Sequence, residues 1–96
     1  MFVLITYDIN TMTKAGRKRL RDVAKICQNY GQRVQNSVFE CKLDEGQFRL
    51  IKHQLYKTMD HDNDSLRLYR LGKNYEKAVE QMGKNEIYNI EKPLIL

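Results

Sequence analysis

The sequence is poor in the features that mark zinc-binding, disulfide-bonded or membrane-spanning proteins. It has two cysteines, Cys27 and Cys41, and their spacing matches no CxxC or other zinc-binding pattern. We interpret both as small buried apolar side chains in a protein of the reducing cytoplasm. No apolar run approaches the ~20 residues that cross a bilayer, and the apolar start, residues 1–7, lacks the basic region of a signal peptide. We therefore expect a cytoplasmic protein with no membrane partner.

Nucleotide-binding loops and repeats are also missing, since the chain has no P-loop, no GxGxxG and no internal repeat. It does have 42% hydrophobic and 30% charged residues over 96 positions, enough for one globular domain with a modest core. Its 17 lysines and arginines exceed its 12 acids, which gives a net charge of +5. This excess favours a polyanionic partner. Composition alone also allows a small regulatory module that binds no nucleic acid.

The first half of the chain predicts a strand, a helix and a strand pair. Residues 2–7 are typical of a central strand with both faces apolar. Apolar residues at helical spacing then predict a helix that begins at Thr11 or Thr13 and stops at Gly31. Residues 33–43 are long for one strand and are interrupted by Gln-Asn-Ser, so we predict two short strands joined by a tight turn or bulge.

The second half completes a recognisable order of elements. Asp44 with Gln47 forms a capping-box pattern at the start of a second helix. Residues 66–71 then alternate as a strand, which Gly72 ends. The resulting order, β-α-β-β-α-β, predicts an α+β ferredoxin-like core over residues 1–72.

Residues 73–96 are predicted to form a C-terminal tail. Within it, residues 77–82 alternate as an extra strand would, whereas residues 75–81 could instead form a short helix. The tail ends in the apolar sequence Pro-Leu-Ile-Leu, for which the predicted core leaves no place. We expect the tail to dock on a partner subunit.

The first predicted helix carries a one-sided basic stripe. The stripe consists of Lys14, Lys18, Arg21 and Lys25, which lie within an arc of roughly 60°. Arg17 lies beside them, and Asp22 is the one acidic residue of the helix that opposes their charge. Like charges four residues apart repel each other unless a partner neutralises them. The stripe therefore indicates either a phosphate-backbone contact or a solvated helix face.

Asp8 follows the first predicted strand directly. A carboxylate at the end of a buried central strand is well placed to hold a metal or another ligand, but it could also cap the following loop or helix. Mg²⁺ takes one or two carboxylates and fills its octahedron with water and phosphate oxygens. No second acid lies near Asp8 in the sequence, so a two-fold axis of a homodimer near this residue would have to supply one.

Three other acids match the start of a calcium-binding loop. Asp60, Asp62 and Asp64 have the D-x-D-x-D spacing, but Ser65 and Leu71 stand where that loop needs glycine and glutamate. We therefore predict a polar connection in place of a calcium site. His53 and His61 are expected at the surface.

Four segments resemble the Cas2 family of CRISPR-associated proteins. They are VLITYDI (3–9), KRLRDVAKICQNY (18–30), GQRVQNSVFEC (31–41) and DSLRLYRLG (64–72), in the family's order and spacing. The tail ending in PLIL resembles the subgroup associated with type I-C systems.

The resemblance implies a ferredoxin-like homodimer in which the tail strand pairs with the partner's sheet. It implies that Asp8 is the catalytic residue and the ligand of Mg²⁺ or another divalent metal, near the two-fold axis. Tyr7, Ser37 and Phe39 are then expected to support the site, and Arg33 to join the basic stripe in binding nucleic acid.

Family members are described as metal-dependent nucleases that cleave RNA or double-stranded DNA. The resemblance therefore implies an endonuclease that hydrolyses DNA or RNA phosphodiesters. It also implies an alternative role, a non-catalytic scaffold that bridges two integrase dimers and holds spacer DNA during its insertion into the CRISPR array.

Overall fold

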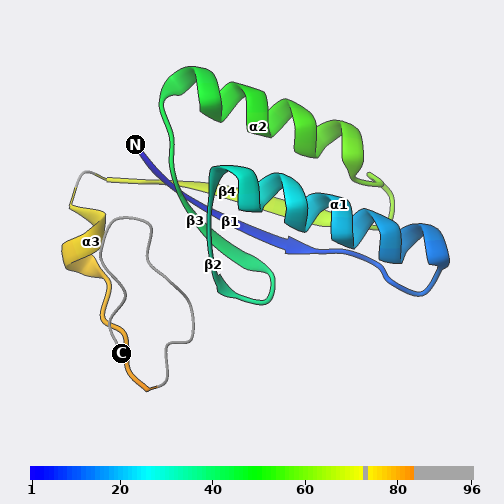
Figure 1. Cartoon of the computed structure of the whole chain (residues 1–96), viewed down its shortest axis with the longest axis horizontal. Coiled ribbons are helices and arrows are strands. Elements are labelled where there is room, and N and C mark those ends of the chain that lie inside the picture. The colour runs from blue at the N-terminus through cyan, green and yellow to red at the C-terminus, as the bar shows by residue number, and fades with distance from the viewer. Residues whose placement is uncertain (73, 84–96) are drawn as a thin grey trace.

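The computed structural model describes residues 1–72 and 74–83 (Figure 1). In chain order the elements are β1 (Phe2–Asp8), α1 (Lys14–Tyr30), β2 (Gly31–Gln35), β3 (Val38–Lys42), α2 (Glu45–Thr58), β4 (Ser65–Leu71) and α3 (Tyr75–Ala78). None of the described helices is long and apolar enough to span a membrane.

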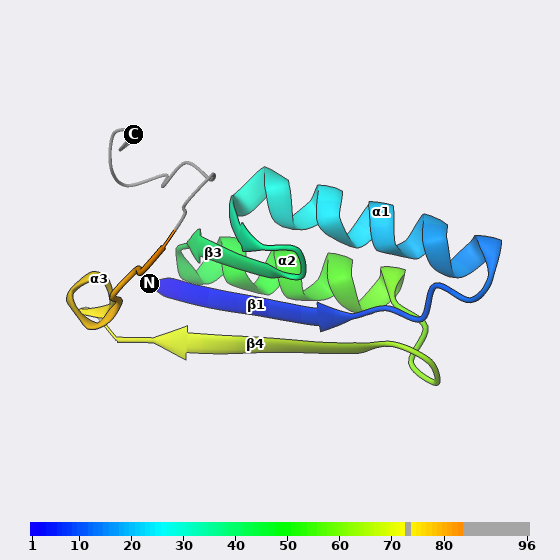
Figure 2. The same cartoon turned by 90° about the horizontal axis from the view of Figure 1, so that it is seen from below.

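The four strands form one antiparallel sheet in the order β2-β3-β1-β4. Helices α1 and α2 lie side by side and cover the same face of this sheet (Figure 1, Figure 2). The predicted α+β ferredoxin-like βαββαβ fold is therefore confirmed.

The core lies between the sheet and the two helices. Strand β1 alternates, so that Val3, Ile5 and Tyr7 are buried on the helix side. Both cysteines are also in this core, as predicted, and each is 0% exposed. Burial raises the pKa of both thiols to about 12, which keeps them protonated and unreactive.

The opposite face of the sheet is less covered than the sequence predicts. Phe2, Leu4 and Thr6 are only half-buried, although we expect both faces of the first strand to be covered. The helices lie on one face alone. On the other face the Tyr75 ring of α3 lies 5.2 Å from the Phe2 ring, and the Tyr75 hydroxyl bonds the Glu40 carboxylate. We call the side of the sheet that bears Phe2, Leu4 and Thr6 the open face.

Local signals set the element boundaries as predicted. Thr13 caps α1 by accepting a hydrogen bond from the Gly16 amide at 3.0 Å, and Asp44 with Gln47 forms the capping box of α2. The predicted strand pair is confirmed as β2 and β3, with a register shift between Arg33 and Gln35.

Gly31 ends α1 for a reason other than backbone freedom. Its φ of −161° is ordinary extended backbone, and the residue already pairs with Cys41 as the start of β2. A Cβ at this position would lie 2.4 Å from both the Cys41 Sγ and the Glu40 carbonyl oxygen. Only glycine lets the helix lead directly into the strand at this close approach.

In the tail, the short-helix prediction is confirmed and the strand prediction for residues 77–82 is wrong, because α3 spans Tyr75–Ala78. Tyr75 is the first residue of this helical turn, and its ring contacts the Phe2 ring. A strand beyond residue 83, the PLIL end and its pairing with a partner lie outside the described residues. The division of the chain at residue 72 stays a prediction.

Candidate functional site

Asp8 is the last residue of β1 and pairs with Ser65 at the start of β4. Alternation along the strand places it on the open face with Thr6, and it is exposed. Thr13 caps α1, and Asn10 accepts the Met12 amide at 3.0 Å within the loop. The alternative use of Asp8 as a cap is therefore wrong. Within residues 1–72 and 74–83 its carboxylate has no hydrogen bond or ion pair, so both oxygens can bind a ligand.

The described part of the chain places one exposed carboxylate at the end of β1, that of Asp8. In the described part of the chain, no three acidic, histidine or cysteine side chains gather closely enough to hold a metal ion. One exposed carboxylate fits Mg²⁺, which accepts one or two carboxylates and completes its shell with water and phosphate oxygens.

Tyr7, Ser37 and Phe39 meet beside Asp8, but on the inner side of the sheet. The Tyr7 amide donates to the Ser37 carbonyl at 3.1 Å, and its hydroxyl donates to the Asn36 carbonyl at 3.3 Å. The Tyr7 ring stacks on the Phe39 ring at 6.2 Å, and burial raises the pKa of the Tyr7 hydroxyl. The Tyr7 and Phe39 side chains point away from the Asp8 carboxylate, and Ser37 joins them through its backbone carbonyl, so the three can support only the strand end that carries Asp8.

Arg33 lies apart from the other predicted nucleic-acid contacts. It is half-buried on β2, with its guanidinium carbon 5.2 Å from the centre of the Phe39 ring. Its Nε atom is buried and has no hydrogen-bond partner. Arg33 therefore belongs with Tyr7 and Phe39, and its contact with nucleic acid stays a prediction.

The basic stripe lies on the solvent side of α1. The four stripe residues and the neighbouring Arg17 are all exposed: Lys14, Lys18, Arg21 and Lys25, with Arg17. Lys18 binds Asp22 at 2.6 Å, and Arg17 donates to the Thr11 carbonyl at 3.3 Å. The Lys18 hydrogen bond, with Arg21 and Lys25 nearby, lowers the pKa of Asp22. The stripe thus keeps an excess of positive charge.

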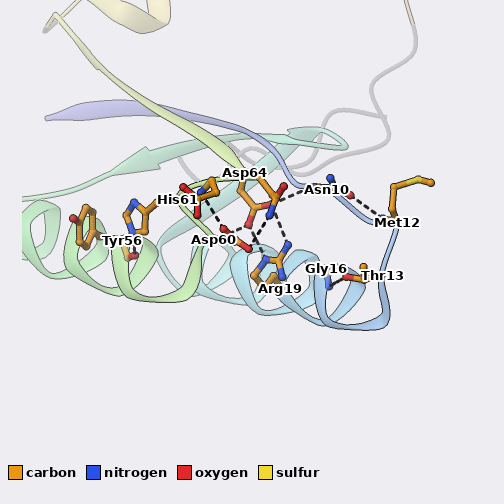
Figure 3. Close-up of polar contacts among 11 residues, drawn as sticks. Asn10, Met12, Thr13, Gly16, Arg19, Tyr56, Asp60, His61 and Asp64 are labelled. Carbon is orange, nitrogen blue, oxygen red and sulfur yellow. Dashed lines mark hydrogen bonds and ion pairs between the residues drawn. The ribbon is translucent and has the colours of Figure 1, made fainter.

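The D-x-D-x-D acids organise the loop between α2 and β4 (Figure 3). Asp60 accepts the Asp62 amide at 2.9 Å and the Asn63 side-chain amide at 3.1 Å. Asp64 binds Arg19 of α1 at 2.8 Å. This pair is a contact that sequence reasoning misses, because 45 residues separate its members. The one sequence signal that points to a structural use of these acids is that the loop is rich in aspartate but lacks the glycine of a calcium site.

Both histidines lie at the surface, as predicted. His53 is exposed on α2. A ring nitrogen of His61 lies 2.9 Å from the Tyr56 carbonyl, and the two rings are 4.2 Å apart (Figure 3).

Comparison with known proteins places these features in a family. The family model described as CRISPR associated protein Cas2 matches residues 1–79. A relative from Halalkalibacterium halodurans, named CRISPR-associated endonuclease Cas2, is 56% identical over 95 residues and matches 99% of each chain. A relative from Chlorobaculum tepidum, named CRISPR-associated endoribonuclease Cas2, is 54% identical over the full length of both chains. The crystal structure of Streptococcus pyogenes Cas2 has a TM-score of 0.78 and 59% identity, covering 86% of this chain and 100% of that one.

Proposed function

The chain belongs to the Cas2 family of CRISPR-associated proteins, and we propose that it is a metal-dependent endonuclease that cleaves nucleic-acid phosphodiesters with Asp8 as its catalytic carboxylate. The observation that carries this proposal is the exposed carboxylate of Asp8 at the end of the central strand, which has no bonded partner among the described residues. The names of the relatives, endonuclease and endoribonuclease, support the same activity.

The site is complete only in a homodimer. A two-fold axis near the end of β1 would bring two Asp8 carboxylates together, because such an axis places the same residue of each copy at one point. The open face supplies a mixed surface for this contact. Leu4 is half-buried and its ladder neighbour Tyr69 is 41% exposed, whereas Glu40 beside Leu4 and Arg67 beside Thr6 are charged. The C-terminal tail is expected to add a strand to the partner's sheet.

Each group of this chain has a separate task in the proposed reaction. The two Asp8 carboxylates would be the residues that hold the cation. A bound Mg²⁺ would polarise the phosphodiester and lower the pKa of a coordinated water. The basic stripe on α1 holds the phosphate backbone by charge and favours no base sequence.

A second role, a scaffold in CRISPR adaptation, is favoured by the position of the basic stripe. If two open faces meet, both α1 helices lie on the outside of the dimer, where their lysines and arginines are free to contact duplex DNA. Such a dimer could bridge two integrase dimers without cleaving DNA. This role does not need Asp8.

An Asp8→Asn variant tests the nuclease proposal. We expect cleavage of RNA and duplex DNA substrates to fall more than about 100-fold across a titration of Mg²⁺ and Mn²⁺, because removing only an outer partner of a metal ligand costs 10–100-fold. Circular dichroism and the dimer mass should stay unchanged, since the Asp8 side chain has no partner within the described residues. Asp62→Asn, which removes an exposed loop carboxylate, is the matched control. Undiminished cleavage by Asp8→Asn would point to a contaminating nuclease and refute the proposal.

A further inference from the structure

We propose that Asp64 is a positioning residue that fixes the Asp8 end of β1 through a buried contact with Arg19, an inference that rests on the proposed function. Asp64 is the third acid of the D-x-D-x-D loop, and the nuclease proposal gives it no task. It lies at the junction of the loop after β1, helix α1 and the start of β4 (Figure 3).

The Asp64 carboxylate is fully buried and fully used. Its side chain is 0% exposed, and the paired Arg19 side chain is 19% exposed. Arg19 donates from Nε to Oδ2 at 2.8 Å and from Nη2 to Oδ1 at 3.4 Å. The Asp60 amide donates to Oδ2 at 2.8 Å, and the Asn10 amide donates to Oδ1 at 3.0 Å. With both oxygens occupied, Asp64 cannot itself be a metal ligand.

One of these hydrogen bonds and a neighbouring strand pair hold the segment that carries Asp8. Asn10 lies two residues after Asp8, and its amide is fixed by the Asp64 carboxylate. Ser65, the neighbour of Asp64 in the chain, pairs with Asp8 across the β1–β4 ladder. The intervening Ile9 is buried, with 7% of its surface exposed. The backbone is therefore held at Asp8 itself and two residues later at Asn10, while no described residue bonds the Asp8 side chain.

The loop after β1, which contains Asn10, lies directly on the first turn of α1. A Cβ at Gly16 would be 1.9 Å from the Asn10 carbonyl oxygen, so only glycine permits this contact. Arg19 projects from the same helix toward Asp64 (Figure 3). The buried carboxylate thus joins α1, the end of β1 and the start of β4 at one point.

The chemistry of the contact makes Asp64 sensitive to a small change. All four hydrogen bonds to Asp64 come from N–H donors, and an amide side chain offers one oxygen acceptor and one NH₂ donor. In Asp64→Asn the NH₂ group must therefore face two donors, either Arg19 Nε and the Asp60 amide or Arg19 Nη2 and the Asn10 amide. The side chain keeps its shape, but in each orientation it loses one bond to Arg19 and one bond to a backbone amide.

Small displacements matter at this place because the proposed site is made of two copies of Asp8. Catalytic groups must be held within about 0.5 Å of their productive geometry. A shift of Asn10 moves the strand end in both subunits, so the two carboxylates separate by the sum of both shifts.

The test compares Asp64→Asn with Asp62→Asn, the same change at an exposed position of the same loop. Hydrogen exchange of the Asn10 amide reports directly on its hydrogen bond to Asp64. Exchange of the Val23 amide in the core reports on global folding. Mn²⁺ binding, measured by paramagnetic resonance without nucleic acid, reports the site. We expect exchange of the Asn10 amide to rise at least about tenfold while Val23 stays protected, and Mn²⁺ affinity to fall about 10–100-fold.

Arg19→Lys is the second variant, in case Asp64→Asn does not fold. It keeps the positive charge but replaces the two-pronged guanidinium with a single ammonium group, so we expect an intermediate loss of Mn²⁺ affinity. Faster exchange at Asn10 with wild-type Mn²⁺ affinity would overturn the positioning role. If Asp8→Asn binds Mn²⁺ as tightly as the wild type, the proposed function itself fails. If only Asp8→Asn loses Mn²⁺, the positioning inference alone is refuted.

Discussion

At the scale of single residues, Asp8 and Asp64 show how surroundings give one side-chain type two tasks. Asp8 is exposed and unpaired within the described residues, so its carboxylate can take a ligand. Asp64 is buried, which on its own raises its pKa, but the hydrogen bonds from Arg19 and from the Asp60 and Asn10 amides outweigh burial and lower the pKa below its usual value. Asp64 is therefore ionised at neutral pH and serves the structure.

The lowered pKa of Asp64 predicts how this residue contributes to stability with pH. A carboxylate whose folded pKa lies below its unfolded value of about 3.9 stabilises the fold above that value and loses this contribution as pH falls through the folded pKa. The melting temperature of the wild type should exceed that of Asp64→Asn at neutral pH, and the gap should narrow below about pH 4. Thermal unfolding followed by circular dichroism at a series of pH values measures this difference in melting temperature. A gap that widens in acid would contradict the assigned cause.

At the scale of elements, α1 has two faces with different tasks. Its inner face packs Gly16, Val23 and Cys27 into the core. Its outer face carries the basic stripe, and the helix has no acidic residue in its first turn to offset this charge. Asp22 neutralises Lys18 alone by direct contact. The stripe residues without a bonded partner in the described part of the chain are Lys14, Arg21 and Lys25.

Neutralising these three residues together should weaken nucleic-acid binding through its salt dependence. Each lost phosphate contact reduces the slope of log affinity against log salt by about 0.9 for duplex DNA, so the triple glutamine variant should lose up to about 2.7 in slope. Fluorescence anisotropy with one labelled duplex over a series of salt concentrations gives both slopes.

The matched control for the stripe removes the same charge from α2. Arg49, Lys52 and Lys57 are all exposed there, and their triple glutamine variant has the same net charge as the α1 variant. If the two variants lose the same slope, net charge and not the α1 stripe governs binding.

At the scale of the whole molecule, the open face of the sheet is the surface on which apolar residues of the central strand stay partly exposed in a single chain. Strand β1 is central in the sheet, yet Phe2 and Leu4 are only half-buried, because both long helices cover the other face. A second copy on this face would bury them and would bring the two Asp8 residues together.

Leu4→Glu tests the assembly, because a charge on this face should prevent two copies from packing. We expect the mass in solution, measured by light scattering after gel filtration, to fall to that of one chain, and Mn²⁺ binding to be lost with it. Leu50→Glu is the control, since Leu50 is 49% exposed on α2 in the helix layer. A Leu4→Glu variant that stays dimeric would place the contact elsewhere.

The features that the sequence determined by itself are local. A short run with both faces apolar predicted β1, and helical spacing predicted α1 and α2. Neighbouring side chains predicted the threonine cap and the capping box of Asp44 and Gln47. These signals can be read because the interacting groups lie within four residues of one another. The position of Asp8 directly after the first strand singled it out, and the resemblance to known segments pointed to the same residue, whose catalytic role is a proposal.

Only the tertiary structure decided which residues distant in the sequence contact one another. It covered one face of β1 and left the other open, and it turned the start of the tail into a helix that carries Tyr75 to Phe2. It also joined Asp64 to Arg19 and Asn10, across separations of 45 and 54 residues. The physical reason is that a carboxylate becomes a ligand or an anchor according to the donors and the water around it, and folding brings those donors from distant parts of the chain.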